Sequence, residues 1–177
     1  MIVAPVTFLL LVYSDDTHSS RHLIFFTTFF FSTLTSIITV LYLKKINKIS
    51  DLDASIREQR IQPLAIGAIY HGIGFLALWA LNATPIVKGL MFCYALNTAV
   101  VWFITLKWKI SIHAIGLGGP LVALWLHGFH YPIFMGTLLL IVCTSRVLLK
   151  AHTPSQVITG SALAMGLAYI ELNLLFL

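Results

Sequence analysis

Apolar segments alternate with short polar connections along the whole chain. They cover residues 2–13, 22–43, 63–81, 86–106, 111–127, 131–149 and 157–177. A helix needs about 20 residues to cross the hydrocarbon of a bilayer, and six of the seven segments reach or approach that length. The first is too short for an upright span, which leaves a half-helix, an interfacial helix or the remnant of a longer N-terminus. The pattern predicts an all-α, polytopic membrane bundle of six to seven helices, with residues 1–177 in a single domain.

The composition excludes the soluble alternatives. Apolar residues make up 59% of the 177 positions and charged residues only 10%, whereas soluble domains carry roughly 25% charged residues. A chain this short cannot bury so much apolar surface in a water-soluble fold. Membrane lipids are therefore the expected partners, and no nucleic-acid partner is expected. The pattern does not specify an oligomeric state.

Small residues recur once per helical turn in the last segment, at Gly160, Ala164 and Ala168. Such spacing is typical of a face that packs closely against another helix. Gly116, Gly118 and Gly119 in the fifth segment are expected to serve the same purpose, or to leave backbone room for a ligand. The long polar stretch 44–62 holds Asp51 and Asp53, which are expected to cap a short helix that reaches Arg60.

The cations are distributed unequally between the two ends of the predicted bundle. Counting crossings places loops 44–62, 107–110 and 150–156 at one end, and 14–21, 82–85, 128–130 and the C-terminus at the other. The first end carries nine cations, namely Lys44, Lys45, Lys48, Arg57, Arg60, Lys107, Lys109, Arg146 and Lys150. The other end carries Arg21 and Lys88. The positive-inside rule assigns the richer end to the cytoplasm.

Three polar clusters lie at this richer end, over residues 57–63, 109–113 and 145–156. They supply guanidinium groups, ammonium groups and two imidazoles, and arginine forks match phosphate oxygens. Three predicted helix N-termini point at the same region and favour anions. Two imidazoles beside a phosphate allow one to attack phosphorus while the other protonates the leaving alcohol. The clusters therefore predict a phosphate site at the membrane edge.

The clusters resemble the three-part signature of the type 2 phosphatidic acid phosphatase superfamily, which is related to the vanadium haloperoxidases. That signature reads Lys-x6-Arg-Pro, Pro-Ser-Gly-His and Ser-Arg-x5-His-x3-Asp. The matching positions are Arg60 and Pro63, with Arg57 in place of the lysine, then Ser111 and His113, and finally Ser145, Arg146 and His152. The resemblance is to a small, divergent bacterial branch, and it covers roughly residues 55–177.

This resemblance implies a phosphatidic acid phosphatase/haloperoxidase-like core and a metal-independent phosphatase without a cofactor. It implies that His152 is the nucleophile, forming a phosphohistidine, and that His113 is the general acid. The implied phosphate ligands are Arg57, Arg60, Lys109, Ser111 and Arg146. The substrate is expected to be a lipid phosphomonoester or diphosphate that enters from the bilayer. The implied location is the bacterial inner (cytoplasmic) membrane with the active site on the outer face, opposite to the side that charge counting favours.

Two positions depart from the signature. Gln156 replaces the aspartate that orients the nucleophile, and Ile112 replaces the motif glycine. Gln156 accepts a hydrogen bond but carries no charge, so the alternative is a degenerate, non-catalytic relative that binds a lipid phosphate. A helix that starts at Thr153 places the Gln156 amide near the His152 imidazole, since residues four apart share a helix face.

The remaining histidines suggest a third function, a haem-binding electron-transfer bundle. His71, His127 and His130 lie away from His113 and His152, and the sequence has no Cys-x-x-Cys-His motif. These three histidines are expected to be packing or interfacial residues in the opposite half, and the haem alternative is disfavoured.

Overall fold

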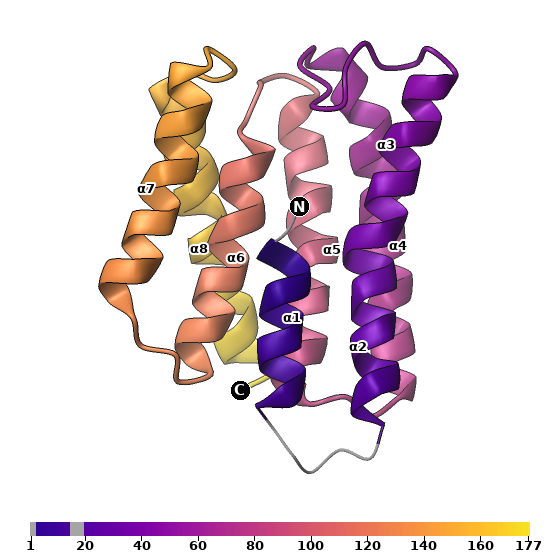
Figure 1. The fold of residues 1–177 in the computed structure, drawn as a ribbon, viewed down its shortest axis with the longest axis vertical. Coiled ribbons are helices and arrows are strands. Elements are labelled where there is room, and N and C mark those ends of the chain that lie inside the picture. The colour runs from indigo at the N-terminus through magenta and orange to yellow at the C-terminus, as the bar shows by residue number, and fades with distance from the viewer. Residues whose placement is uncertain (1–2, 15–19) are drawn as a thin grey trace.

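The computed structural model describes residues 3–14 and 20–177, and all regular elements in these ranges are helical. The elements are α1 (Val3–Tyr13), α2 (Arg21–Phe29), η1 (Phe30–Leu34), α3 (Thr35–Lys45), η2 (Glu58–Arg60), α4 (Ile61–Ala80), α5 (Pro85–Thr105), α6 (Ile112–Leu126), α7 (Pro132–Leu148) and α8 (Pro154–Leu175). The π-helical turn η1 joins α2 to α3 without a break, so 21–45 forms one long helix. The helices stand side by side with their connections at two ends (Figure 1). The all-α bundle predicted from the apolar segments is confirmed.

Four helical stretches of the described chain are long and apolar enough to cross a membrane: 21–45, 58–80, 85–105 and 154–175. Helices α6 and α7 are apolar but shorter, with 15 and 17 residues. Proline opens α5, α7 and α8 within their first turns, where its missing N–H costs nothing. Asn82 and Lys150 adopt positive φ angles just after α4 and α7, as is common where a helix stops.

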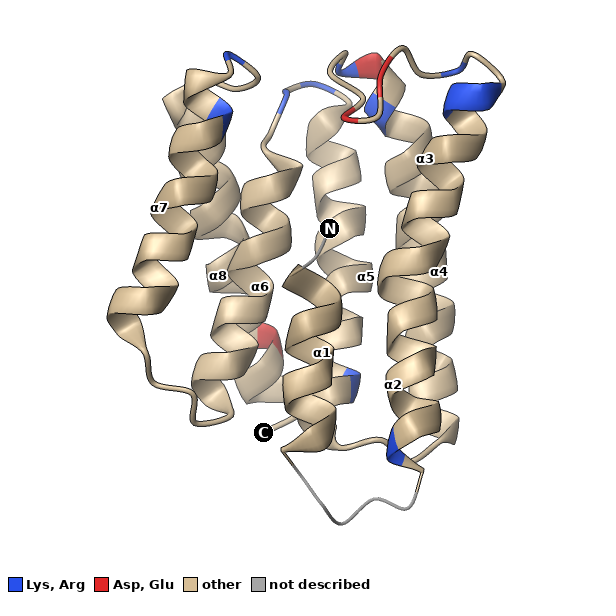
Figure 2. Cartoon of the chain, viewed as in Figure 1, with Lys and Arg blue, Asp and Glu red and all other residues tan. Residues whose placement is uncertain are grey.

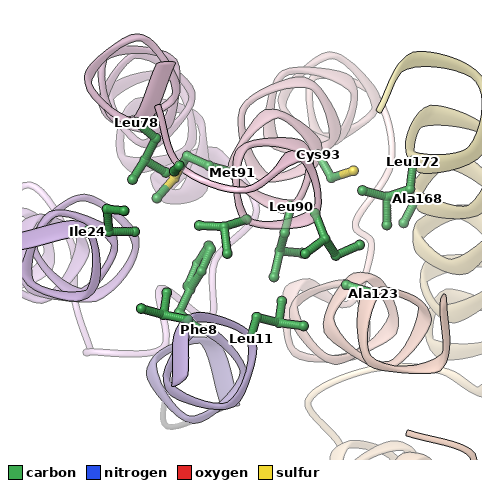
Figure 3. Close-up of a cluster of buried hydrophobic side chains, with 14 of the residues drawn as sticks. Phe8, Leu11, Ile24, Leu78, Leu90, Met91, Cys93, Ala123, Ala168 and Leu172 are labelled. Carbon is green, nitrogen blue, oxygen red and sulfur yellow. The ribbon is translucent and has the colours of Figure 1, made fainter. Parts of the chain in front are cut away.

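Helix α1 is short but lies inside the bundle. Phe8 and Leu11 are fully buried and face Leu90 and Met91 of α5 (Figure 3). This burial identifies the first apolar segment as a half-length helix packed into the core, and it does not fit an interfacial helix. The same cluster includes Ile24 of α2, so α1 fills the space between the first long helix and α5.

Helices α6 and α8 pack closely along the stripe of small residues. Gly160, Ala164 and Ala168 are all buried. A Cβ atom added to Gly118 of α6 would lie 3.0 Å from the Ala164 Cβ atom, and one added to Gly160 would lie 3.1 Å from the Ser111 carbonyl oxygen. The predicted packing face is thus confirmed, and it brings the beginnings of α6 and α8 together.

The loops lie at the two ends of the bundle that counting the helix crossings predicted (Figure 2). Loops 46–57, 106–111 and 149–153 lie together at one end, which is called the basic end below, and most of the lysines and arginines gather there (Figure 2). One local expectation was wrong, because no helix starts at Asp51. Its Oδ1 atom accepts hydrogen bonds from the backbone N–H groups of Asp53 at 2.9 Å and Ser55 at 3.2 Å. These bonds stabilise a turn in competition with a helix, and only η2 precedes α4.

Candidate phosphate site at the basic end

Arg60 is the central cation of the basic end. It closes η2 immediately before α4 and is only 4% exposed. Its Nε atom donates to the Ala54 carbonyl at 2.7 Å, and Nη1 donates to the Ile110 carbonyl at 3.1 Å. Two backbone carbonyls therefore fix the guanidinium group, and its other N–H groups remain for further acceptors because arginine carries five.

His152 lies in the loop between α7 and α8 and is buried beside Arg60. Nη1 of Arg60 donates to Nε2 of His152 at 3.4 Å. Because a guanidinium group only donates, Nε2 carries the lone pair and Nδ1 carries the proton. Burial, together with the charges of Arg60 and Lys109, lowers the pKa of His152 to about 4, although its hydrogen bond with Gln156 acts in the opposite direction. The imidazole is therefore neutral at pH 7, and its Nε2 is unprotonated and accepts from Arg60.

Gln156 holds the other side of this ring. Its Oε1 atom accepts from Nδ1 of His152 at 3.0 Å and from the Thr153 backbone N–H at 3.3 Å. In return the Thr153 hydroxyl accepts from the Gln156 backbone N–H at 3.4 Å, which completes a capping box at the start of α8. The contact that the four-residue spacing predicted is therefore present, and the Thr153 backbone N–H fixes the orientation of the glutamine side chain.

Arg146 and His113 converge on a carboxylate that sequence reasoning did not assign to the site. Nη1 of Arg146 lies 3.1 Å from Oδ2 of Asp53, and Nε2 of His113 lies 4.0 Å from Oδ1 of the same residue. The Nε atom of Arg146 is buried and has no hydrogen-bond partner among the described residues. The signal that points to Asp53 is its position, since it is an acid in the long loop of the end that carries most of the cations.

The other predicted ligands make structural bonds. Lys109 donates from Nζ to the Ala151 carbonyl at 2.8 Å, and burial together with the Arg60 charge lowers its pKa. Ser111 is fully buried, and its hydroxyl caps α6 by accepting from the Ala114 N–H at 3.4 Å. Arg57 donates to Glu58 and to the Leu106 carbonyl, each at 2.7 Å. Lys109 therefore stays beside His152, whereas Ser111 and Arg57 connect elements of the scaffold.

A cavity of about 350 Å³ begins among these groups and continues into the bundle. Asp53, Arg60 and His113 line it at the basic end, and Gly116 of α6 lines its wall. His152 and Arg146 do not line it, and Arg60 connects the cavity with His152 through its Nη1 atom. Arg60 and His113 are therefore the candidate phosphate-binding side chains that face the cavity, whereas His152 lies behind Arg60.

No family model, curated protein or solved structure matches the chain. Across residues 3–14 and 20–177, no three His, Cys, Asp or Glu side chains lie close enough together to hold a metal ion. The interpretation of the site therefore depends on its own groups, which are two imidazoles, two arginines, one lysine and one carboxylate.

Proposed function

We propose that the protein is an integral membrane phosphatase that hydrolyses a lipid phosphomonoester or diphosphate through a phosphohistidine on His152. The observation that carries the proposal is the state of the His152 ring. Its Nδ1–H is held by Gln156 and its Nε2 lone pair lies beside Arg60. A neutral imidazole suits attack on a phosphoryl group when one nitrogen is fixed and the lone pair of the other is shared only with a guanidinium group that a phosphate can draw away.

The first half-reaction forms a nitrogen–phosphorus bond. Nε2 of His152 attacks phosphorus, and the bond from phosphorus to the oxygen of the lipid alcohol breaks. His113, which lines the cavity, gives its proton to the departing oxygen. Arg60 binds the phosphoryl oxygens while negative charge redistributes on them. Arg146 joins it when the phosphate displaces the Asp53 carboxylate, which pairs with Arg146 and lines the cavity.

The second half-reaction restores the protein. His113 takes a proton from water, the water oxygen attacks the phosphohistidine, and the nitrogen–phosphorus bond breaks to release inorganic phosphate. The free Nε2 lone pair then returns to the Arg60 guanidinium group. None of these steps requires a metal ion, and the substrate enters from the bilayer because the cavity lies between apolar helices.

The decisive experiment measures phosphate release from a short-chain lipid phosphate by purified protein. His152→Ala is expected to reduce turnover to background, and EDTA is expected to leave wild-type turnover unchanged. His130→Ala is the matched control, since His130 is exposed and contacts Trp125. A His152→Ala protein that keeps wild-type turnover would contradict the proposal, and so would EDTA inhibition that Mg²⁺ reverses.

A second candidate is a non-catalytic protein that binds a lipid phosphate. Two observations favour it, namely the uncharged Gln156 next to the nucleophile and the guanidinium group that occupies Nε2 of His152. Tight binding of lipid phosphates without phosphate release from any of them would support this candidate over the enzyme.

For the membrane location, we propose the inner membrane of a bacterium with the basic end on the outer face. Lys48 is exposed in the loop of the basic end, and Cys93 and Cys143 are the free cysteines of the described chain. In a protein with both cysteines replaced by serine, Lys48→Cys is expected to react with an impermeant maleimide on intact cells. Reaction only after lysis would place the site in the cytoplasm.

A further inference from the structure

The inner part of the cavity is polar, although it lies between apolar helices. His71 of α4, Tyr94 and Asn97 of α5, and Ser32 and Thr33 of η1 all line it. His71 is 7% exposed and Asn97 is 5% exposed. Polar side chains at this depth of a membrane bundle are costly, so this group requires a partner that compensates for its burial.

Three atoms of the group have no partner. Nε2 of His71, the hydroxyl of Tyr94 and Oδ1 of Asn97 are buried without a hydrogen bond among the described residues. They belong together, since the His71 and Tyr94 rings lie 5.4 Å apart between centroids. Nδ1 of His71 also lies 3.4 Å from the hydroxyl of Thr98, the residue after Asn97. Buried polar atoms are nearly always paired in native proteins.

The backbone is also unusual at this place. Ser32 and Thr33 lie in the π-helical turn η1 of the long helix 21–45, and their hydroxyl oxygens are 3.2 Å apart. Single π-helical turns inside α-helices often occur at functional sites. Here the turn adds two hydroxyl-bearing residues to the lining of the cavity that His71 and Asn97 also line.

The unpaired atoms restrict the chemistry of the occupant. Oδ1 of Asn97 only accepts, so the occupant has to donate a hydrogen bond, and the Tyr94 hydroxyl is able to donate one in return. A carbonyl or ether oxygen would leave Asn97 unpaired, and a charged group would be expensive at this depth. A hydroxyl group both donates and accepts, and it carries no charge.

We propose that this inner part of the cavity is a binding site for a hydroxyl group on the apolar chain of the lipid phosphate. The inference rests on the proposed function for the position of the phosphate at the basic end. Arg60 and His71 both line the cavity. His71 lies eleven residues after Arg60, a rise of about 16 Å at 1.5 Å per residue. The hydroxyl group is therefore expected near the middle or far end of the lipid chain, away from the phosphate ester.

The test compares dodecyl phosphate with a series of dodecyl phosphates that carry one hydroxyl at successive chain positions. For one position of the hydroxyl, the purified wild-type protein is expected to show a kcat/KM about tenfold above that for dodecyl phosphate, since sites with buried polar groups reject analogues that leave them unpaired. Asn97→Leu is expected to bring this ratio to about one, and Tyr94→Phe to lower it without a change in side-chain volume. Asn173→Leu, at an exposed position of α8, is the matched control.

A second arm does not depend on phosphatase activity. It measures the rise in Tm caused by dodecanol and by the same alcohol with a mid-chain hydroxyl, for wild type and Asn97→Leu. A larger rise with the hydroxylated alcohol in wild type alone supports the site even if no lipid phosphate is hydrolysed, in which case only the proposed function fails. Hydrolysis without any hydroxyl preference overturns the inference and indicates a water-filled cavity. The same Tm rise with both alcohols also overturns it.

Discussion

Oε1 of Gln156 lies 3.0 Å from Nδ1 of His152, in the position that an orienting carboxylate would take. The glutamine therefore fixes which nitrogen of the ring carries the proton. It would not balance the positive charge that the proposed attack on phosphorus places on the ring. Orientation and charge compensation are two separate effects of an aspartate at such a position. This chain keeps the first effect and lacks the second.

Substitutions of Gln156 separate these two effects. Gln156→Leu removes the acceptor of Nδ1–H and is expected to lower turnover about a hundredfold or more, since losing the correct tautomer in a serine protease costs about 10⁴. Gln156→Glu keeps the length of the side chain and adds a negative charge, so it is expected to raise the rate of phosphohistidine formation. Rapid-quench measurement of the phosphorylated protein reports that step directly.

The control for Gln156 is a variant that damages only the helix cap. Thr153→Val removes the hydroxyl that accepts from the Gln156 backbone N–H but leaves the hydrogen bond to His152. It is expected to lower stability by about 1 kcal/mol, as loss of a cap does, with turnover nearly unchanged. If Gln156→Leu and Thr153→Val show the same turnover, Gln156 contributes only through the cap and not by orienting His152.

The pKa of His152 gives a direct test of its buried, neutral state. Burial and the neighbouring cations lower this pKa to about 4 from the ordinary value of 6.5. Since the unfolded chain binds the proton more readily, the stability that the neutral ring contributes is present above pH 6.5 and is lost as the pH falls through about 4. An NMR titration of the ring is expected to show this low midpoint, with His152→Gln identifying the resonance. A midpoint near 6.5 would mean that the ring is open to water.

The long helices were predictable because each consists of one uninterrupted apolar block that ends at a strong signal. Pro85, Pro132 and Pro154 open helices, and the polar breaks between blocks agree with the observed ends within a few residues. The contact between His152 and Gln156 was predictable for a similar reason, since it depends only on local helix geometry. Burial of α1 was not, because its packing partners are distant in the sequence.

Directions of side chains at the basic end were the least predictable feature. Sequence spacing places the Arg57 guanidinium group and the Ser111 hydroxyl near the site. It does not reveal that Arg57 donates to the Leu106 carbonyl or that Ser111 accepts from the Ala114 N–H. The contact between Arg60 and His152 joins residues 92 positions apart, and only the complete fold brings them together. The π-helical turn η1 also escapes detection, because it inserts a residue without interrupting the apolar pattern.

The close contact of α6 and α8 positions the site, and Gly160 tests this role. The Ser111 backbone N–H donates to the Gln156 carbonyl at 3.3 Å, next to Gly160. Gly160→Val would place its Cβ atom 3.1 Å from the Ser111 carbonyl oxygen, so the helices have to separate. Overpacking of this kind costs about 1–3 kcal/mol. Gly160→Val is therefore expected to lower both Tm and the affinity for phosphate.

Gly166 provides the control in the same helix. A Cβ atom added there meets no atom within 4 Å, so Gly166→Val makes the same chemical change without a clash. It is expected to keep the wild-type Tm and phosphate affinity. Equal losses in both variants would show that valine in α8 itself, and not the contact with α6, causes the effect.

In the proposed mechanism, a phosphate has to compete with the Asp53 carboxylate for Arg146. Its Oδ2 atom lies 3.1 Å from Nη1 of Arg146, where the proposed mechanism places a phosphoryl oxygen. Removing a partly exposed charge next to an anion changes the binding free energy by about 1 kcal/mol, which is roughly fivefold. Asp53→Asn is therefore expected to lower the KM for a lipid phosphate about fivefold, and the effect is expected to shrink as salt screens the charge.

Asp51→Asn is the matched control for this substitution. Asp51 accepts hydrogen bonds from Ser55 and from the Asp53 backbone within its own loop, and no contact joins it to Arg146 or His113 in the described chain. It is expected to change KM much less than Asp53→Asn does, although it removes the same charge from the same loop, because its charge acts on Arg60 and Lys109 only at a distance. If Asp53→Asn instead lowers kcat at constant KM, the carboxylate does not compete with phosphate. Asp53 then orients His113 for proton transfer, as the 4.0 Å distance between Oδ1 of Asp53 and Nε2 of His113 allows.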